Sequence, residues 1–300
     1  MPLRDAIARF VPDGSSIVIG TALEAAIPFA AGHEIIRQGR RDLTLIGPIS
    51  DILFDELIGA GCVSKVAAAW VGNVSAGLAH NFRRAVEQGI PHRIQVQDYS
   101  NLTLSLALQA AALGSPFIPT QSLLGSDIPS TNPDLHIISS PLNGERLLLV
   151  PALKPDVAIV HVQRSDEEGN AHAWGNLGVT EEAALAAGRI LIVAEEIVPR
   201  QVILSDPNRV LAPSFRVAAV VHEPGGAHPS PVQGYYNRDH LYFEDYHRSS
   251  RTRAGFEQWL QEWVTGVRDR GEYLHKLGEE RWQALQAGEH RYAEPVDYGY

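Results

Sequence analysis

Cysteine is almost absent from this sequence: Cys62 is the only one among 300 residues. No disulfide can form within the chain, and the sequence gives no support for an oxidising compartment. Cys62 follows a Gly-Ala-Gly turn and precedes a β-rich run, so we expect a small buried side chain and not a nucleophile.

Long apolar segments are also missing. No apolar run approaches the ~18 residues of a membrane-spanning helix, so no span is predicted. The first residues, MPLRDAIARFVPDG, are too short and too charged for a signal peptide. We therefore expect a cytoplasmic protein.

Positive charge is the scarcer sign. The chain has 25 Lys and Arg against 35 Asp and Glu, which gives a formal net charge of -10. This excess of acid disfavours nucleic acid as a partner, because nothing offsets the repulsion of the phosphates. A small anionic ligand is still possible where local N–H groups or a single arginine bind it.

Three common signatures of binding or catalysis are absent. The sequence has no GxxxxGK[ST] phosphate loop, no GxGxxG after its first strand and no GxSxG nucleophile elbow. A standard dinucleotide fold is therefore disfavoured. The 12 histidines include no HExxH pattern and have no cysteine pair beside them, so no metal site is expected.

What the chain does contain is a regular alternation of β-rich runs and helical patterns. Runs such as SIVIG (16–20) and DLTLIG (42–47) end in glycine, and a helical pattern follows each of them. The alternation predicts an α/β fold with an open, mostly parallel sheet flanked by helices. Thr180 is expected to cap the helix at 180–187, and 202–204 to add a short apolar run. We expect strands at 16–20, 42–47, 64–71, 93–97, 157–162, 189–194 and 217–221, and helices at 3–10, 28–39, 51–58, 78–88, 102–113 and 180–187.

Two regions depart from this rhythm. Residues 120–146 hold several glycines and prolines around a small strand at 135–138, which is typical of a functional loop or a partner contact. After residue 240 the composition changes to Glu, Gln, Arg and Trp at helical spacing. We expect an α/β domain at 1–245 and, packed on it, a C-terminal helical extension and polar tail at 246–300. The tail has three tyrosines that could dock: Tyr292, Tyr298 and Tyr300.

Polar donors gather where the predicted strands end. In an open α/β sheet, ligands bind beyond the carboxyl ends of the strands, so these exits are candidate binding positions. Loops rich in glycine and proline, such as the one after the last strand, are often built for contact, although a purely structural turn is the alternative at each exit. The candidate substrate-binding residues are Gly72, Asn73, Ser75, Ser100, Asn101, Ser126, Gly225, Gly226 and His228.

No single catalytic residue stands out. Glu24, Asp98, Asp127 and Glu223 are carboxylates near strand exits, yet each also fits a helix cap or a paired surface group. The segment 72–77 is placed like a nucleophile elbow but lacks its spacing. A nest of N–H groups that approaches an acyl or carboxylate group suits it better, with Asn73 and Ser75 as side-chain donors.

Five segments, in collinear order, resemble the A subunit of family I CoA-transferases, in particular the glutaconate CoA-transferase-like branch. The resemblance runs from about residue 10 to residue 270, which makes it more specific than any one motif. The segments are HEIIRQGRRDLTLIG (33–47), WVGNVSAG (70–77), DYSN (98–101), QAAALGSPFIPTQSLLGSDI (109–128) and GGAHPSPVQGYYNRDHLYF (225–243).

The resemblance implies a NagB/RpiA-like fold and an enzyme of two kinds of subunit. Such proteins pair an A subunit with a B subunit, often as a heterotetramer, and move CoA between carboxylic acids. A glutamate, usually of the B subunit, forms an acyl anhydride and then a glutamyl-CoA thioester. This chain would then lack the nucleophile, bind no cofactor tightly, and use a CoA thioester and a carboxylic acid as substrates. The loop 225–228 would be a wall of the shared site, and 235–246 a stretch of subunit contact.

Two departures from the family pattern leave alternatives open. Many members have Gly-Gly at the first strand exit, where this chain has Gly20 and Thr21. A related branch hydrolyses CoA thioesters with ring opening and uses a glutamate in the segment equivalent to 98–101, where this chain offers Asp98. A hydrolase subunit that uses Asp98 and a non-catalytic acid-binding module are therefore the two alternatives.

Overall fold

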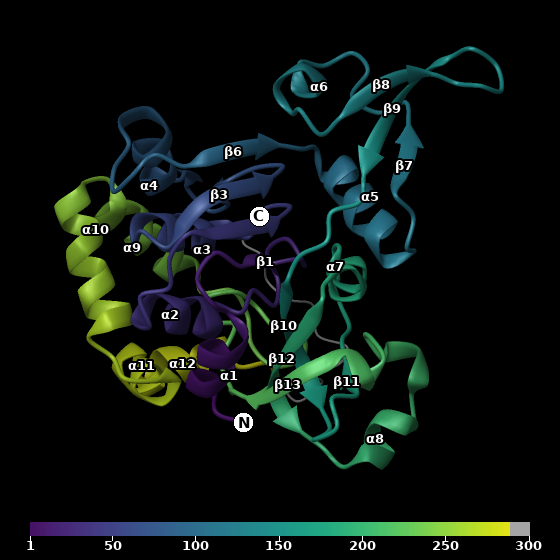
Figure 1. Ribbon diagram of the computed structural model, residues 1–300. Helices are drawn as coiled ribbons and strands as arrows, with labels where there is room; N and C mark the ends of the chain where they lie inside the picture. Colours follow the sequence, from purple (N-terminus) through teal and green to yellow (C-terminus); the bar gives the residue numbers. More distant parts are fainter. Residues whose placement is uncertain (289–300) are drawn as a thin grey trace.

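The computed structural model describes residues 1–288 and is built around one sheet of eight strands (Figure 1). The strand order is β13-β12-β10-β1-β2-β3-β6, and β11 pairs with β10 outside this path. Every neighbouring pair along the path is parallel, whereas β10 and β11 run antiparallel. The predicted α/β fold is therefore confirmed. The strands are β1 (Ser16–Ile19), β2 (Leu43–Gly47), β3 (Val63–Ala68), β6 (Gln95–Asp98), β10 (Val157–Ser165), β11 (Ala171–His172), β12 (Arg189–Ile197) and β13 (Val217–His222).

Helices cover both faces of the sheet, because successive strand residues point their side chains to opposite faces. In β1, Ile17 and Ile19 belong to one buried apolar cluster and Val18 to the other. Since β1 lies between β2 and β10, its exit is surrounded by the exits of those two strands. Helices α1 (Leu3–Phe10), α2 (Phe29–Arg37) and α3 (Asp51–Gly59) pack on the first face, and α5 (Asn101–Ala112) and α7 (Thr180–Ala186) on the second.

The C-terminal helical residues from 240 to 277 pack on the first face as well, whereas Trp282 and Leu285 pack against a separate small cluster. Phe256 and Trp259 are buried in the same cluster as Phe54 of α3. Helix α9 runs across residue 245, and the division of the chain at that point stays a prediction. Tyr292, Tyr298 and Tyr300 lie outside the described residues. These helices are α9 (His240–Ser250), α10 (Arg253–Leu260), α11 (Arg270–Leu277) and α12 (Glu279–Leu285).

The irregular region after α5 forms a small sheet of its own. Strands β7 (Phe117–Thr120) and β8 (His136–Ser139) both pair with β9 (Arg146–Pro151) in antiparallel fashion. A short helix, α6 (Ile128–Thr131), precedes β8. In Figure 1 this unit stands at the upper right, away from the main sheet.

Two local predictions were wrong, and a third was correct except at its start. The helix predicted at 78–88 begins at His80, after a hairpin of β4 (Gly72–Asn73) and β5 (Gly77–Leu78); it is α4 (His80–Arg83) and continues as a π-helix over Arg84–Gln88. Thr180 is the first residue of α7 and not its cap, because its hydroxyl donates to the Leu177 carbonyl at 2.5 Å. The apolar run 202–204 lies in helix α8 (Arg200–Leu204), where only Ile203 is buried.

The expectations for the single cysteine and for membrane-spanning segments can be compared with the structure. Cys62 is buried, and burial raises the pKa of its thiol to about 12, so the small inert side chain is confirmed. Among residues 1–288 no helix is long and apolar enough to cross a membrane.

Candidate functional site

Two of the predicted strand exits meet around one groove. A cavity of about 350 Å³ lies beside the ends of β3 and β6, and Gly77 and Asp98 both line it. The two strands are neighbours in register, with Ala68 opposite Asp98, so their exits emerge side by side. The other lining residues are mainly apolar: Val66, Ala68, Ala69, Trp70, Val71, Leu78, Ala79, Phe82 and Val96, with Arg83 the only cation.

The hairpin β4–β5 forms one wall of this groove. Gly72 is required here because a Cβ atom would lie 2.1 Å from the Trp70 ring. Asn73 is buried, and its amide nitrogen donates to the Phe243 carbonyl at 2.8 Å. Its amide oxygen accepts the backbone N–H groups of Ser75 and Ala76, each at 3.0 Å. Asn73 therefore holds the hairpin tip in shape, and its polar atoms are already engaged within the chain.

A strained turn supports the hairpin from the exit of β2. Ser50 and Asp51 have φ of 60° and 46°, a left-handed conformation that is uncommon for residues with a side chain. The Ser50 hydroxyl donates to the Ile19 carbonyl at 2.8 Å, which ties the exits of β1 and β2 together. Asp51 accepts the N–H of Val74 at 3.2 Å. Such buried strain often accompanies a functional site, because the surrounding fold must maintain it.

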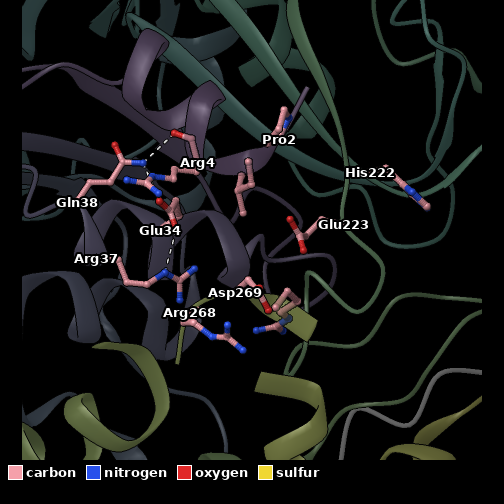
Figure 2. A pocket seen from close by; sticks show the side chains of 11 residues that line it. Pro2, Arg4, Glu34, Arg37, Gln38, His222, Glu223, Arg268 and Asp269 are labelled. Atoms are coloured by element: carbon pink, nitrogen blue, oxygen red, sulfur yellow. Dashed lines mark hydrogen bonds and ion pairs between the residues drawn. The ribbon is translucent and has the colours of Figure 1, made fainter. Parts of the chain in front are cut away.

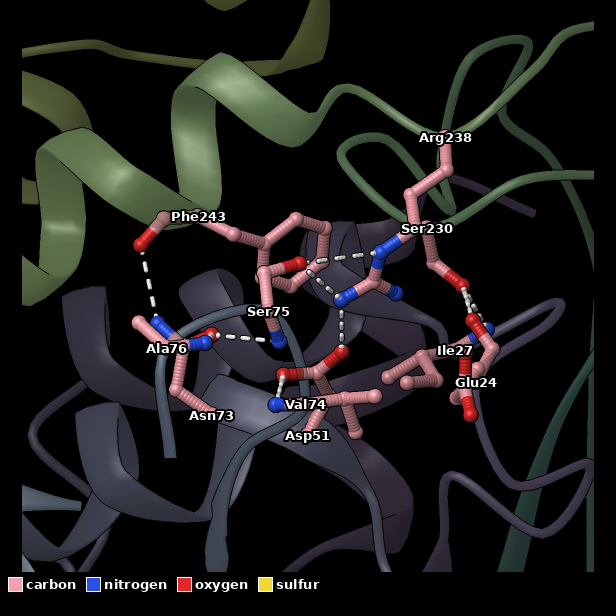
Figure 3. Close-up of polar contacts among 10 residues, drawn as sticks. All are labelled: Glu24, Ile27, Asp51, Asn73, Val74, Ser75, Ala76, Ser230, Arg238 and Phe243. Atoms are coloured by element: carbon pink, nitrogen blue, oxygen red, sulfur yellow. Dashed lines mark hydrogen bonds and ion pairs between the residues drawn. The ribbon is translucent and has the colours of Figure 1, made fainter. Parts of the chain in front are cut away.

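A buried ion pair completes this support (Figure 3). Arg238 donates from Nη2 to Asp51 at 2.6 Å, and both side chains are fully buried. Burial raises the pKa of Asp51, while the charge and hydrogen bond of Arg238 oppose the shift. The guanidinium carbon lies 3.6 Å from the centre of the Phe243 ring, which fixes its plane.

The ion pair orients the hydroxyl of Ser75. Arg238 donates to Ser75 Oγ from Nη2 at 3.1 Å and from Nε at 3.4 Å. Because the oxygen accepts these bonds, its own proton is directed elsewhere, and no acceptor for it occurs among residues 1–288. Ser75 is exposed at the hairpin tip. It can therefore donate a hydrogen bond to a ligand, as a preorganised donor should.

The exit of β6 contributes less than the sequence predicts. Ser100 caps α5: its hydroxyl accepts the N–H of Thr103 at 3.1 Å, and Thr103 Oγ1 accepts the N–H of Ser100 at 2.9 Å. Asn101 is the first residue of the helix and is exposed. Asp98 is exposed on the groove, and its carbonyl accepts from Asn132 at 2.8 Å. The side chain of Asp98 is therefore the polar group that this exit presents to the groove.

Ser126 is not brought to the groove. It lies in the loop before α6 of the small sheet, where its hydroxyl donates to the Leu123 carbonyl at 3.1 Å.

The loop 225–228 is internal. Gly225, Gly226 and His228 are all buried. The N–H of Gly225 donates to Glu195 at 2.7 Å, and Glu195 also contacts His161 Nε2 at 2.6 Å. Gly226 is packed so closely that a Cβ atom would lie 2.7 Å from the Glu223 carbonyl oxygen. The loop is held in place by these internal contacts, and none of these three residues is exposed to solvent.

His228 is held on both sides. Its Nδ1 lies 2.8 Å from the Tyr273 hydroxyl and its Nε2 lies 2.9 Å from Asp239. Burial lowers the pKa of His228 to about 4, although Asp239 opposes the shift. The ring is therefore neutral at pH 7, and both nitrogens have partners within the chain.

The subunit contact expected at 235–246 stays a prediction, and its aromatic residues contribute little exposed surface to it. Tyr235, Tyr236, Tyr242 and Tyr246 are buried inside this chain. Tyr246 donates to Asp55 at 2.6 Å, and Tyr236 donates to Glu195 at 2.5 Å. The stretch packs α9 and the loop before it against the core, so these side chains are not free to contact a partner.

The first strand exit shows why the departure from Gly-Gly is tolerated. Gly20 has φ of 70°, and a Cβ atom would lie 2.6 Å from the Ser50 hydroxyl. Thr21 is buried, and its hydroxyl lies 2.8 Å from that of Thr180. Gly20 alone therefore provides the space that Ser50 needs, and the next position can be the buried side chain of Thr21.

A larger cavity of about 600 Å³ lies between α1, α2, the end of β13 and the start of α11 (Figure 2). Its charges are largely compensated: Glu34 accepts from Arg37 at 2.8 Å, and Asp269 caps α11. Glu223, one of the candidate carboxylates, also lines it; burial raises its pKa and Arg270 opposes the shift. None of the predicted substrate-binding residues lines this cavity.

The sequence analysis missed Asp51 and Arg238. Asp51 begins the helix predicted at 51–58, and Arg238 lies in the segment 225–243, but neither was singled out as a candidate. One signal was present: the helix DILFDELIG is apolar apart from three acids, and all nine residues are buried. Acids inside such a helix indicate internal partners. Within residues 1–288 no group of three or more His, Cys, Asp or Glu side chains is arranged to hold a metal ion.

Comparison with known proteins agrees with this fold. The family model described as Coenzyme A transferase matches residues 1–223. The A subunit of 3-oxoadipate CoA-transferase from Pseudomonas knackmussii is 41% identical over 280 residues, which cover 93% of this chain and 98% of that protein. A cholesterol ring-cleaving hydrolase IpdA subunit from Mycobacterium tuberculosis is 29% identical over 293 residues, which cover 93% and 98% of the two chains.

A solved structure extends the agreement to three dimensions. The crystal structure of glutaconate coenzyme A-transferase from Acidaminococcus fermentans superposes with a TM-score of 0.88 at 33% identity, and 96% of each chain is covered. The resemblance found in the sequence is thus confirmed. The chain belongs to the coenzyme A transferase family, among the A subunits of family I.

Proposed function

We propose that this chain works with a B subunit to move CoA between carboxylic acids, at least one of them a dicarboxylic acid. Its substrates would be an acyl-CoA thioester and a free acid. The relatives whose names mention 3-oxoadipate and glutaconate transfer support the dicarboxylic class.

Ser75 is the observation that carries this proposal. Its exposed hydroxyl is held by the buried pair of Arg238 and Asp51, at the tip of the hairpin whose Gly77 and Leu78 line a groove of about 350 Å³. A donor held in this way stabilises negative charge on an acyl oxygen as a tetrahedral centre forms. Such charge develops when a carboxylate attacks a thioester carbonyl.

The nucleophile would come from the partner. Among the residues that line the groove, only Asp98 carries a carboxylate. In the proposed cycle a glutamate of the B subunit attacks the acyl-CoA carbonyl, which yields an acyl anhydride and CoA thiolate. The thiolate then attacks the glutamyl carbonyl, releases the first acid and leaves a glutamyl-CoA thioester. The second acid accepts CoA by the reverse steps, so that atoms and charge balance over the cycle.

The test is to purify the chain alone and together with the B subunit. Transfer of CoA should require both, and hydroxylamine should trap the thioester on a glutamate of the partner. Transfer by the chain alone, or a trapped thioester on this chain, would contradict the proposal.

The hydrolase alternative rests on Asp98, which lies in the groove, and on the ring-cleaving relative. In that case Asp98 would act as a general base toward water or substrate. Water would add to a carbonyl of a cyclic substrate and a ring bond would break, while the CoA thioester is retained, so no carboxylic acid would be needed for turnover. Addition of one water to the acyl-CoA without an added acid acceptor separates this hydrolysis from transfer.

A further inference from the structure

The groove beside β3 and β6 has one apolar floor and one cation. Val66 and Val96 lie opposite each other in register and line it from the two strands. Trp70, just before the hairpin, and Leu78, within it, also line the groove and are 41% and 47% exposed. An apolar surface of this kind, with a few polar groups at its edge, is the usual form of a small-molecule site.

The cation is Arg83, at the end of α4. It pairs with Glu87 one turn later on the same face, from Nε to Oε1 at 2.9 Å, and both side chains are about half exposed (52% and 51%). Exposed pairs of this kind contribute little to stability and exchange partners readily. In the part of the chain that the structure describes, the two Nη atoms of Arg83 have no protein partner, so they can bind a carboxylate in bidentate fashion.

The hairpin connects this cation to the reacting end of the site. Ser75 is at the hairpin tip, and Gly77 and Leu78 of the same hairpin line the groove. Ser75 does not itself line the groove, but Gly77, two residues later, does, so an acyl group bound at the hairpin tip would extend toward Leu78 and Trp70. Among the lining residues within 1–288, Asp98 is the one anion and repels a second carboxylate, which leaves the Arg83 cation as the group that can bind it there.

We infer that this groove takes the carbon chain of a dicarboxylic acyl group and that Arg83 binds the distal carboxylate. The inference rests on the proposed function and deepens it, because it assigns the preference for a dicarboxylic acid to one residue. Arg83 is a specificity-determining residue and touches no reacting atom.

Calorimetry on the full chain, purified with its B subunit, tests the inference with two acids of equal length, adipate and hexanoate. Adipate should bind more tightly than hexanoate. Arg83→Gln should weaken adipate binding about tenfold or more and leave hexanoate binding unchanged, since a charged hydrogen bond is lost only with the diacid. Leu78→Ala should weaken both acids to a similar degree, because it removes contact with the chain that they share.

Two further variants serve as controls. Arg248→Gln removes an arginine of α9 that also pairs on its own helix, and it should change neither acid. Glu87→Gln removes the competitor of Arg83 and should keep or increase the preference for adipate.

Three results would overturn the inference. They are equal binding of the two acids to the wild type, an Arg83→Gln effect of the same size on both, and release of the B subunit by Leu78→Ala, which would make the groove a protein contact. These failures are distinct from failure of the proposed function, which is scored by CoA transfer and not by binding of free acids.

Discussion

Asp51 and Arg238 are 187 positions apart in the sequence and form a fully buried ion pair 2.6 Å long. The pair joins the strained exit of β2 to the loop before α9, and through Ser75 and Val74 it also holds the hairpin. One contact therefore fixes three separate segments around the candidate site.

Asp51→Asn should destabilise the fold strongly. It leaves the Arg238 charge buried without a counterion, which typically costs about 3–5 kcal/mol. Urea unfolding followed by circular dichroism should show this loss. Asp245→Asn removes an acid from an exposed pair on α9 and should change the free energy of unfolding by less than about 1 kcal/mol. Equal effects of the two variants would show that the buried pair has no special role.

Ser75→Ala should leave stability nearly unchanged and lower transfer activity about 100-fold in the complex with the B subunit. It removes one preorganised donor to the acyl oxygen, and such losses fall mainly on kcat. Steady-state kinetics of CoA transfer provides the measurement. Ser205→Ala, an exposed serine whose hydroxyl donates to the Val202 carbonyl, is the control and should retain full activity. A Ser75→Ala enzyme as fast as the wild type would remove Ser75 from the mechanism.

Asp98→Asn separates transfer from hydrolysis. If the chain is a transferase subunit, this variant should keep transfer within about threefold, because Asp98 binds no reacting group in that cycle. If Asp98 is a general base, hydrolysis of acyl-CoA should fall by about 100-fold or more. Mass spectrometry of the CoA thioesters follows both rates: transfer gives the thioester of the acceptor acid, and ring-opening hydrolysis gives the substrate thioester with one added water.

Stability should decrease as the pH falls from about 6.5 toward 4. Unfolded histidine takes up a proton near its ordinary pKa of 6.5, whereas buried His228 has a pKa of about 4 and stays neutral. The unfolded state therefore binds more protons in this window, and acid favours unfolding. The gap between the two pKa values corresponds to about 3 kcal/mol.

To test this, the free energy of unfolding is measured at several pH values for the wild type, His228→Gln and His136→Gln. The first variant should flatten the dependence between pH 6.5 and 4, and part of the slope should remain because burial also lowers the pKa of His33. His136, on the exposed strand β8, should leave the slope unchanged. An unaltered slope in His228→Gln would show that this ring does not cause the acid sensitivity.

The hairpin shows where sequence reasoning stops. The run 64–71 correctly placed a strand, and WVGNVSAG correctly marked a special turn after it. Local pattern could not reveal that the Asn73 amide would be used up by Phe243, because that contact joins residues 170 positions apart. Nor could it separate Ser75, which is exposed and oriented, from Ser100, which serves as a helix cap.

The loop after β13 shows the same limit. Its glycines and prolines correctly indicated unusual backbone geometry, as the positive φ of Gly225 shows. Whether the loop is exposed or buried depended on distant segments that the local sequence does not reveal. Arg270 donates to the Gly225 carbonyl at 2.7 Å, and Leu274 of α11 and Trp282 of α12 lie against Gly225, so the loop is buried within this chain.

The sequence by itself determined the alternating α/β architecture with a mostly parallel sheet, and the family, because periodicity and motif segments can be read along the chain. The order of the strands, and which polar residues are exposed and which are engaged within the chain, were decided only by the tertiary structure. Burial and hydrogen-bond partners are set by segments far apart in the chain: Arg238 makes Ser75 a donor, and Tyr273 and Asp239 occupy His228.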